Sequence, residues 1–327
     1  MNNPAVAGPV DAAEAAKRET ARRMTVAFAS LADGTADAAQ VRASLTATRR
    51  PRRHIPVAHV QDRTVGDGRI PVRIYHPGGA GLPLVVYLHG GGFVLCDLDS
   101  HDACCRRLVN GIGAIVISVD YRLAPEHRFP AAVDDAWAVT EWVARHGGEL
   151  GGDPTRLVVA GDSAGGNLAA VVAMTARDRG GPSIAFQLLI YPVVDQRRRP
   201  STVRDASARA TLTLEHQRWF TEQYLGPDGD RTRVAVSPIL GDFTGLPPAH
   251  IVTGELDPLR EQGEEFAELL RAAGVSATTR CYPGMFHGFF NLPDDIPLAE
   301  QANADVCSLV RKELNSNEKE EVGRELP

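Results

Sequence analysis

The strongest restraint on the fold of this chain is a strand–turn–helix unit in the middle of the sequence. The apolar run Leu157–Ala160 predicts a buried strand, and Leu168–Met174 predicts a helix. Between them lies Gly161-Asp162-Ser163-Ala164-Gly165-Gly166, in which small residues surround one serine. Glycine lacks a Cβ and lets a strand and a helix close around a tight turn. We therefore expect Ser163 on a strained turn at the edge of a sheet, beside a helix N-terminus.

From about residue 56 onward, short apolar strands alternate with helices. Strands that are apolar along their whole length are buried on both faces, and alternation with helices is typical of parallel sheets. We therefore expect an α/β fold with a mostly parallel central sheet and helices on both faces. The predicted strands are Val57–Val65, Pro71–Tyr75, Leu84–Leu88, Ala114–Val119, Leu157–Ala160, Phe186–Tyr191, His250–Thr253 and Ala277–Tyr282. The predicted helices are Ala103–Asn110, Ala131–His146, Ala164–Arg179, Gln262–Ala273 and Leu298–Leu314.

Two segments stand outside this alternation. Met24, Phe28 and Leu31 recur at helical spacing and give an N-terminal helix one apolar stripe. Between Pro192 and Leu246 we expect no strand, whereas Leu214–Tyr224 predicts a helix. Insertions after strand ends lie over the ligand crevice of such sheets, so both segments are expected to form one lid.

These expectations divide the chain into a cap, a core and a tail. Residues 1–50 are expected to form the N-terminal helical part of the cap, and residues 196–236 the cap insertion. Residues 51–195 and 237–314 would form the core. Residues 315–327 are dominated by charge, which is typical of a disordered tail.

Net charge and cysteine content limit the ligands and the cellular compartment expected for this chain. The net charge is −6 with both signs mixed along the chain, which argues against nucleic-acid binding. The sequence shows no signal peptide, and its apolar runs fall short of the ~20 residues of a membrane helix. The odd number of cysteines, without zinc-like spacing, predicts reduced thiols in a cytoplasmic protein. These cysteines are Cys96, Cys104, Cys105, Cys281 and Cys307.

A serine hydroxyl needs a base within hydrogen-bond reach, and the base needs an orienting acid. Asp257 follows the strand at His250–Thr253, and His287 follows the strand that ends near Tyr282. Both therefore belong to the same sheet edge as Ser163, in the chain order serine, acid, histidine. Glu255 and Glu261 are the alternatives for the acid, and Asp257 is favoured over them.

A glycine loop supplies candidate donors for a developing oxyanion. The strand Leu84–Leu88 runs into His89-Gly90-Gly91-Gly92, whose backbone N–H groups can face a ligand without obstruction by side chains. In the HGGG-type motif such an N–H acts together with that of the residue after the nucleophile, which is Ala164. The alternative interpretation is an ordinary flexible glycine loop.

Taken together, five motifs resemble those of the hormone-sensitive-lipase-like (family IV) bacterial carboxylesterases of the alpha/beta-hydrolase superfamily, from about residue 20 to residue 313. They are His89-Gly90-Gly91-Gly92, Asp120-Tyr121-Arg122-Leu123-Ala124-Pro125-Glu126, Gly161-Asp162-Ser163-Ala164-Gly165-Gly166, Asp257-Pro258-Leu259-Arg260 and His287-Gly288-Phe289. The resemblance implies an alpha/beta-hydrolase fold with a helical cap. It also implies that His89 shapes the glycine loop and that Asp120–Glu126 is a structural turn.

The resemblance assigns roles to the candidate residues. Ser163 would be the nucleophile, Asp257 the acid and His287 the base. The oxyanion hole would consist of the N–H groups of Gly91, Gly92 and Ala164. The expected substrates are short- to medium-chain acyl esters, with no metal or organic cofactor, and the expected assembly is a homodimer.

One position departs from the pattern: Cys96 stands where a glycine or another small residue is expected. It would narrow the pocket or make the enzyme sensitive to thiol reagents.

Three alternative functions stay open: an amidase or peptidase, a lipase, and a small-molecule receptor. An amidase or peptidase and a lipase share the serine elbow, and the triad does not distinguish an ester from an amide. A small-molecule receptor on the same fold would lack the histidine, whereas this chain has His287. A dehalogenase or epoxide hydrolase would need a carboxylate in place of Ser163.

Overall fold

The computed structural model describes residues 19, 31, 36–49, 52–66, 69–197 and 211–324, with side chains up to residue 315. Met24 and Phe28, on the expected N-terminal helix, lie outside the described residues, whereas Leu31 is fully buried.

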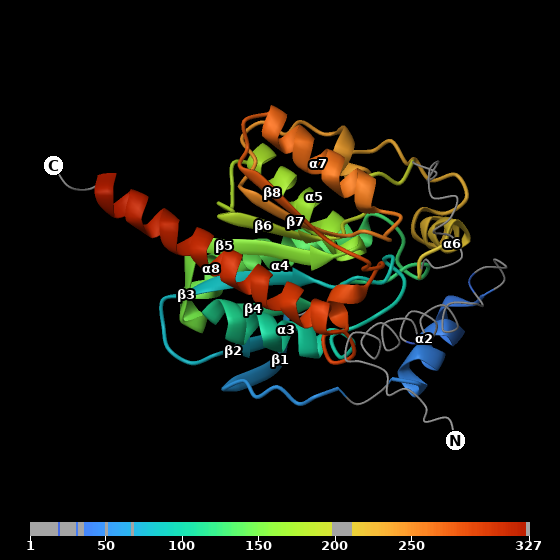
Figure 1. The fold of residues 1–327 in the computed structure, drawn as a ribbon, viewed down its shortest axis with the longest axis horizontal. Helices are drawn as coiled ribbons and strands as arrows, with labels where there is room; N and C mark the ends of the chain where they lie inside the picture. Colours follow the sequence, from blue (N-terminus) through green and yellow to red (C-terminus); the bar gives the residue numbers. More distant parts are fainter. Residues whose placement is uncertain are drawn as a thin grey trace, which may run out of the picture.

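Eight strands form one sheet in the order β1-β2-β4-β3-β5-β6-β7-β8 (Figure 1). β1 pairs antiparallel with β2 and β2 antiparallel with β4, and the other neighbours are parallel. All eight expected strands are therefore confirmed. Their bounds are β1 His59–Val65, β2 Ile70–His76, β3 Leu82–Leu88, β4 Ile115–Val119, β5 Gly152–Asp162, β6 Phe186–Ile190, β7 Ala249–Gly254 and β8 Ala277–Tyr282.

Strand β3 shows why helices cover both faces of the sheet. Leu84, Val86 and Leu88 point into one buried cluster, and Val85 and Tyr87 point into the other. Successive side chains of a strand alternate between faces, so an uninterrupted apolar strand requires cover on both. The first face is covered by α4 Ala131–His146, α5 Ala164–Asp178 and α7 Arg260–Ala272, and the second by α3 Asp102–Leu108 and α8 Pro297–Arg324.

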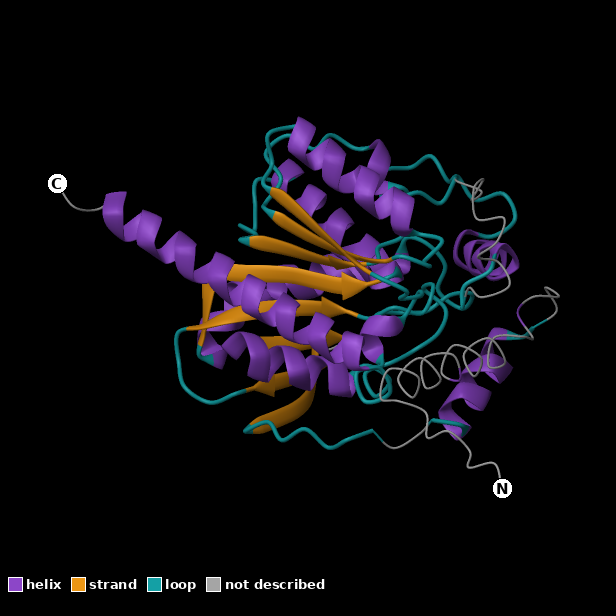
Figure 2. Ribbon diagram, in the orientation of Figure 1, coloured by secondary structure: helices purple, strands orange, loops and turns teal. Residues whose placement is uncertain are grey.

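Two helices lie apart from these layers. Figure 2 shows α2 (Ala38–Ala47) and α6 (Leu214–Leu225) beyond the arrowheads of the parallel strands, where the loops after the strands gather. A reciprocal cap begins α6: Thr213 Oγ1 accepts from the N–H of His216, and His216 Nδ1 accepts from the N–H of Thr213, both at 3.2 Å. The indole N–H of Trp219 donates to the carbonyl of Ala36 at 3.2 Å, which joins α6 to the segment before α2.

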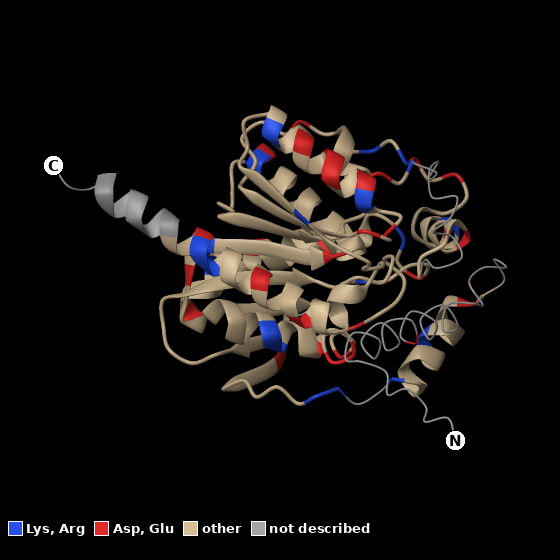
Figure 3. Cartoon of the chain, viewed as in Figure 1, with Lys and Arg blue, Asp and Glu red and all other residues tan. Residues whose placement is uncertain are grey.

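Figure 3 shows residues of both charges along α7 and α8. Shorter helical turns lie between the main elements. The turns are the π-helical η2 Val109–Gly113 and the 3₁₀ turns η3 Gly147–Leu150, η4 Pro238–Leu240 and η5 Phe289–Asn291.

The expectation of a disordered tail from Asn315 is wrong for the residues up to Arg324, because α8 continues to that residue. The extension contains no proline, and its glutamates and lysine are strong helix formers. A high charge content therefore did not prevent a helix here.

The packing of α8 rests on a close approach to η2. A Cβ on Gly111 would lie 2.4 Å from Sγ of Cys307 on α8 and 2.7 Å from its Cβ. We expect Gly111→Ala to lower the free energy of unfolding by about 1–3 kcal/mol, because the overpacked helix must shift. Urea denaturation measures the change, with Gly148→Ala as the control, because a Cβ there meets nothing within 4 Å. Equal stability of the two variants would contradict the prediction.

Candidate active site

Ser163 lies at the turn between β5 and α5 with a strained backbone. Its φ of 55° and ψ of −115° place a non-glycine residue in a region that costs energy. The N–H of Ser163 donates to the carbonyl of Ile190 at 2.8 Å, and its own carbonyl accepts from the N–H of Asn167 at 3.1 Å and of Val193 at 3.2 Å. These contacts with the end of β6 and the first turn of α5 hold the serine in the strained conformation.

The small residues around Ser163 are explained by backbone contacts. A Cβ on Gly165 would lie 1.8 Å from the carbonyl oxygen of Leu88, and a Cβ on Gly161 would lie 2.4 Å from the backbone of Gly165. Helix α5 therefore begins in direct contact with the end of β3, and only glycine permits this approach.

The structure brings the three predicted side chains together. His287 Nε2 lies 2.9 Å from Ser163 Oγ, and His287 Nδ1 lies 2.8 Å from Asp257 Oδ2. The Asp257 side chain is fully buried, and its Oδ1 accepts from the N–H of Leu259 at 2.8 Å. The carboxylate therefore fixes which ring nitrogen of the imidazole meets the serine.

The alternatives for the acid lie elsewhere. Glu255 Oε2 accepts from the N–H of Gly284 at 2.6 Å and so braces the loop that leads to His287. Glu261 is exposed on the first turn of α7. Of the three carboxylates, Asp257 is the one hydrogen-bonded to His287.

The glycine loop lies beside the serine. Gly91 and Gly92 have φ of 114° and 62° and line the same cavity as Ser163 and His287. In the described part of the chain, the N–H groups of both glycines donate to no protein acceptor, and the N–H of Ala164 is the first of α5 and has no helical partner. The geometry leaves these three donors available to a ligand.

The residues expected to shape this loop are buried around it. The His89 ring stacks on Tyr121 with centroids 4.3 Å apart, and the Tyr121 hydroxyl donates to the His89 carbonyl at 2.8 Å. Burial, followed by the charge of nearby His101, lowers the pKa of His89 to about 4, so its ring is neutral near pH 7. The N–H of Ala124, within the Asp120–Glu126 turn, donates to the carbonyl of Phe93 at 2.9 Å.

Two contacts on His287 were not predicted from the sequence. The hydroxyl of Thr211, which precedes α6, donates a hydrogen bond to the His287 carbonyl at 2.8 Å. The ring centroids of Tyr191 and His287 lie 4.8 Å apart. Tyr191 directly follows β6, so the rule that pointed to Asp257 could also have found it. Thr211 carries no comparable signal, because its partner is 76 residues away in the sequence.

A cavity of about 500 Å³ lies over Ser163 and His287. Leu214, Gln217 and Phe220 of α6 line it opposite the glycine loop. Within the predicted helix Leu214–Tyr224, Phe220 lines the cavity, whereas Trp219, like Leu31, is buried in the core. In the described part of the chain, His, Cys, Asp and Glu form no cluster that could hold a metal ion, and no helix is long and apolar enough to cross a membrane.

Cys96 lines the same cavity with φ of 73°, a conformation that favours glycine. This backbone explains why a glycine was expected at the position. Burial, followed by the charge of Asp162, raises the pKa of the thiol to about 12. The side chain therefore narrows the cavity as a neutral thiol.

Known proteins are similar to this chain in sequence and in fold. The chain matches an alpha/beta-hydrolase-fold family over residues 85–291. It is 44% identical over 291 residues to carboxylesterase NlhH of Mycobacterium tuberculosis, covering 86% of this chain and 91% of that protein. It is 39% identical to an ethyl acetate hydrolase of Pseudomonas putida, covering 77% and 81% of the two chains. The solved structure of a hyperthermophilic esterase from Pyrobaculum calidifontis is similar with a TM-score of 0.80 at 39% identity, covering 89% and 97%.

The fold and the site define a serine hydrolase of the alpha/beta-hydrolase class. Within that class, the chain belongs to the hormone-sensitive-lipase-like family of carboxylesterases.

The raised pKa of Cys96 leads to a prediction about thiol reagents. The thiolate is the reactive form of cysteine, and a thiol with a pKa of about 12 is almost entirely protonated near pH 7. We expect iodoacetamide at pH 7 to leave the rate of ester hydrolysis within about twofold of the untreated rate. The assay compares treated and untreated protein, with Cys96→Ser in parallel. Inactivation of the unmodified chain but not of Cys96→Ser would contradict the prediction.

Proposed function

We propose that this carboxylesterase hydrolyses acyl esters with Ser163 as nucleophile, His287 as base and Asp257 as the orienting acid. The observation that carries the proposal is the unbroken hydrogen-bonded line from Asp257 through His287 to Ser163, at 2.8 and 2.9 Å. All three side chains are buried or nearly so, which strengthens the electrostatic coupling between them.

In the acylation step, His287 Nε2 takes the proton of Ser163 as Oγ attacks the ester carbon. Asp257 holds the imidazole in one tautomer and stabilises the imidazolium that forms. The imidazolium then gives its proton to the leaving alcohol, and the acyl group stays on Oγ. Water repeats the sequence on the acyl-enzyme, and His287 acts again as base and then as acid.

The negative charge of each tetrahedral intermediate falls on the former carbonyl oxygen. We assign its stabilisation to the N–H groups of Gly91, Gly92 and Ala164, which have no protein acceptor in the described part of the chain. Gly91 and Gly92 line the cavity over Ser163, and Ala164 directly follows the nucleophile. Backbone donors that are already oriented cost no reorganisation when the charge develops.

We further propose that residues 1–50 and 196–236 form a cap over a core of residues 51–195 and 237–314. The support is the position of α2 and α6 beyond the carboxyl ends of the strands, and the Trp219–Ala36 hydrogen bond that joins them (Figure 1). Phe220 reaches the glycine loop from this side, since a Cβ on Gly92 would lie 2.2 Å from its ring. The acyl chain would therefore lie between α6 and the glycine loop.

A homodimer and a cytoplasmic site of action are also proposals. The position of β8 at the end of the sheet supports pairing between two copies. The five cysteines, all in the free thiol form, support a reducing compartment.

The nucleophile is tested by removing its oxygen. We expect Ser163→Ala to lower kcat for p-nitrophenyl acetate by at least about 10⁴-fold, because removing one triad member abolishes the acyl-enzyme route. A fluorophosphonate probe should label the wild-type protein and not the variant. Turnover by Ser163→Ala near the wild-type rate, with circular dichroism showing both proteins folded, would defeat the proposal.

The substrate range is tested with a series of p-nitrophenyl esters. A cavity of about 500 Å³ is of ordinary size for a small ligand, and one similar protein is named an ethyl acetate hydrolase. We therefore expect kcat/KM to be highest for short- to medium-chain acyl groups and to fall for long ones. A profile that stays flat or rises to long chains would contradict this expectation.

A further inference from the structure

Asp162, the residue directly before Ser163, is a buried carboxylate that the catalytic steps do not use. It is 4% exposed and ends strand β5. The side chain contacts Tyr87, which points to the face of the sheet that α3 covers, and His101, which directly precedes α3.

Its two oxygens bind segments that are far apart in the sequence. Oδ1 accepts from the Tyr87 hydroxyl at 2.8 Å and from the N–H of Gly90 at 2.9 Å. Oδ2 accepts from Nδ2 of Asn291 at 3.0 Å, and His101 Nε2 lies 3.2 Å from Oδ1. Gly90 begins the glycine loop, and Asn291 ends the turn η5 that follows His287.

These donors keep the carboxylate ionised. Burial alone would raise its pKa, but the charge of His101 and the hydrogen bonds from His101 and Tyr87 outweigh burial and hold the pKa of Asp162 below its usual range. An ionised carboxylate accepts stronger hydrogen bonds than a neutral group does, so its hold on the loops is correspondingly firmer.

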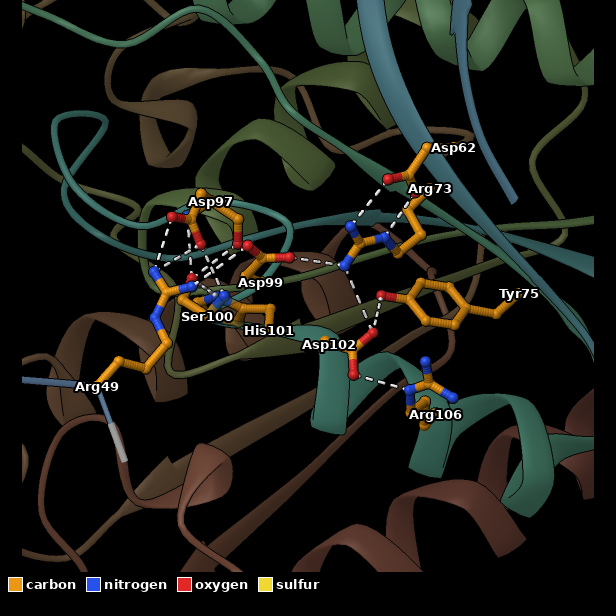
Figure 4. A network of polar contacts seen from close by, with 10 residues as sticks. All are labelled: Arg49, Asp62, Arg73, Tyr75, Asp97, Asp99, Ser100, His101, Asp102 and Arg106. Atoms are coloured by element: carbon orange, nitrogen blue, oxygen red, sulfur yellow. Dashed lines mark hydrogen bonds and ion pairs between the residues drawn. The ribbon is translucent and has the colours of Figure 1, made fainter. Parts of the chain in front are cut away.

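An outer layer of polar contacts fixes His101 in turn (Figure 4). His101 Nδ1 lies 2.9 Å from the Ser100 hydroxyl, and the N–H of Ser100 donates to Asp97 Oδ1 at 2.7 Å. Arg49, two residues beyond the end of α2, donates to both oxygens of Asp97 at 2.7 and 2.9 Å. The network therefore runs from the end of α2 to the carboxylate beside the nucleophile.

We propose that Asp162 is a positioning residue for ester hydrolysis: it holds the glycine loop and the loop after His287 in register with Ser163. Its bond to Gly90 orients the N–H groups of Gly91 and Gly92. Its bond to Asn291 fixes the position of the His287 loop relative to Ser163. Catalytic groups must be held within about 0.5 Å of the productive geometry, so a small displacement of either loop is costly. The inference rests on the proposed function.

Three variants test the proposal. Asp162→Asn keeps the size and shape of the side chain but replaces one carboxylate oxygen with an NH₂ group. In one orientation of the amide this group faces the Asn291 donor; in the other it replaces the oxygen that accepts from Gly90. Asn291→Ala removes the hydrogen bond between Asp162 and the His287 loop and leaves the carboxylate in place. This variant tests the proposal if Asp162→Asn does not fold. Asp135→Asn is the matched control, because Asp135 of α4 is also a buried carboxylate but binds Arg122, at 2.7 Å, rather than Gly90 or Asn291.

We expect kcat for p-nitrophenyl acetate to fall by about 10–100-fold in Asp162→Asn and about 5–10-fold in Asn291→Ala, with KM within about threefold of wild type. The inhibition constant of a trifluoromethyl ketone, which forms a tetrahedral adduct on Ser163, should rise by the same factor as kcat/KM falls. The matching unfluorinated ketone should bind all four proteins equally. Asp135→Asn should lower Tm while kcat stays within about twofold.

Two results would overturn the proposal. One is a kcat within about twofold of wild type in both Asn291→Ala and a folded Asp162→Asn. The other is a loss of kcat in Asp135→Asn as large as in Asp162→Asn, because the loss of any buried carboxylate would then be enough to lower activity. If the wild-type protein hydrolyses no ester, the proposed function fails first, so the two failures are distinct.

Discussion

The contact between the start of α5 and the end of β3 is the constraint on which the rest of the site depends. Gly165 approaches the Leu88 carbonyl so closely that a Cβ would lie 1.8 Å from it. This approach places the first turn of α5 against the loop that begins at His89. As a result, the nucleophile, the helix N-terminus and the glycine loop share one small volume. A bulkier residue at the contact would move the nucleophile and the helix N-terminus away from the glycine loop, because packed interiors transmit a displacement rather than absorb it.

The parallel sheet then supplies the remaining groups. Parallel strands β3, β5, β6, β7 and β8 all end at the same edge, and each is followed by a loop that contributes to the site. β7 leads to Asp257 and β8 leads to His287, so neighbouring strands place the acid beside the base. Helix α6 closes the space above this edge. The fold thus fixes the distances, and the side chains provide the chemistry.

Sequence patterns predicted the parts of the molecule that follow local rules. Uninterrupted apolar strands fixed the sheet, and the rule that site residues follow strands pointed to Ser163, Asp257 and His287. Asn291 and Thr211 escaped prediction, because their roles come from partners 129 and 76 residues away and no local pattern marks them. The end of α8 was misjudged for a related reason. Charge content favours solvation, but it does not decide between a helix and a disordered segment when the residues are good helix formers.

A buried anion one residue from the nucleophile presents a physical difficulty. The transition state places negative charge on the substrate oxygen, and a bare carboxylate nearby would raise its energy. Asp162 avoids this penalty because Tyr87, Gly90, Asn291 and His101 surround it with donors, so its charge is already compensated. Two of these donors belong to the loops that must be held in place. The contacts that neutralise the carboxylate are therefore the same contacts that give it its hold on the site.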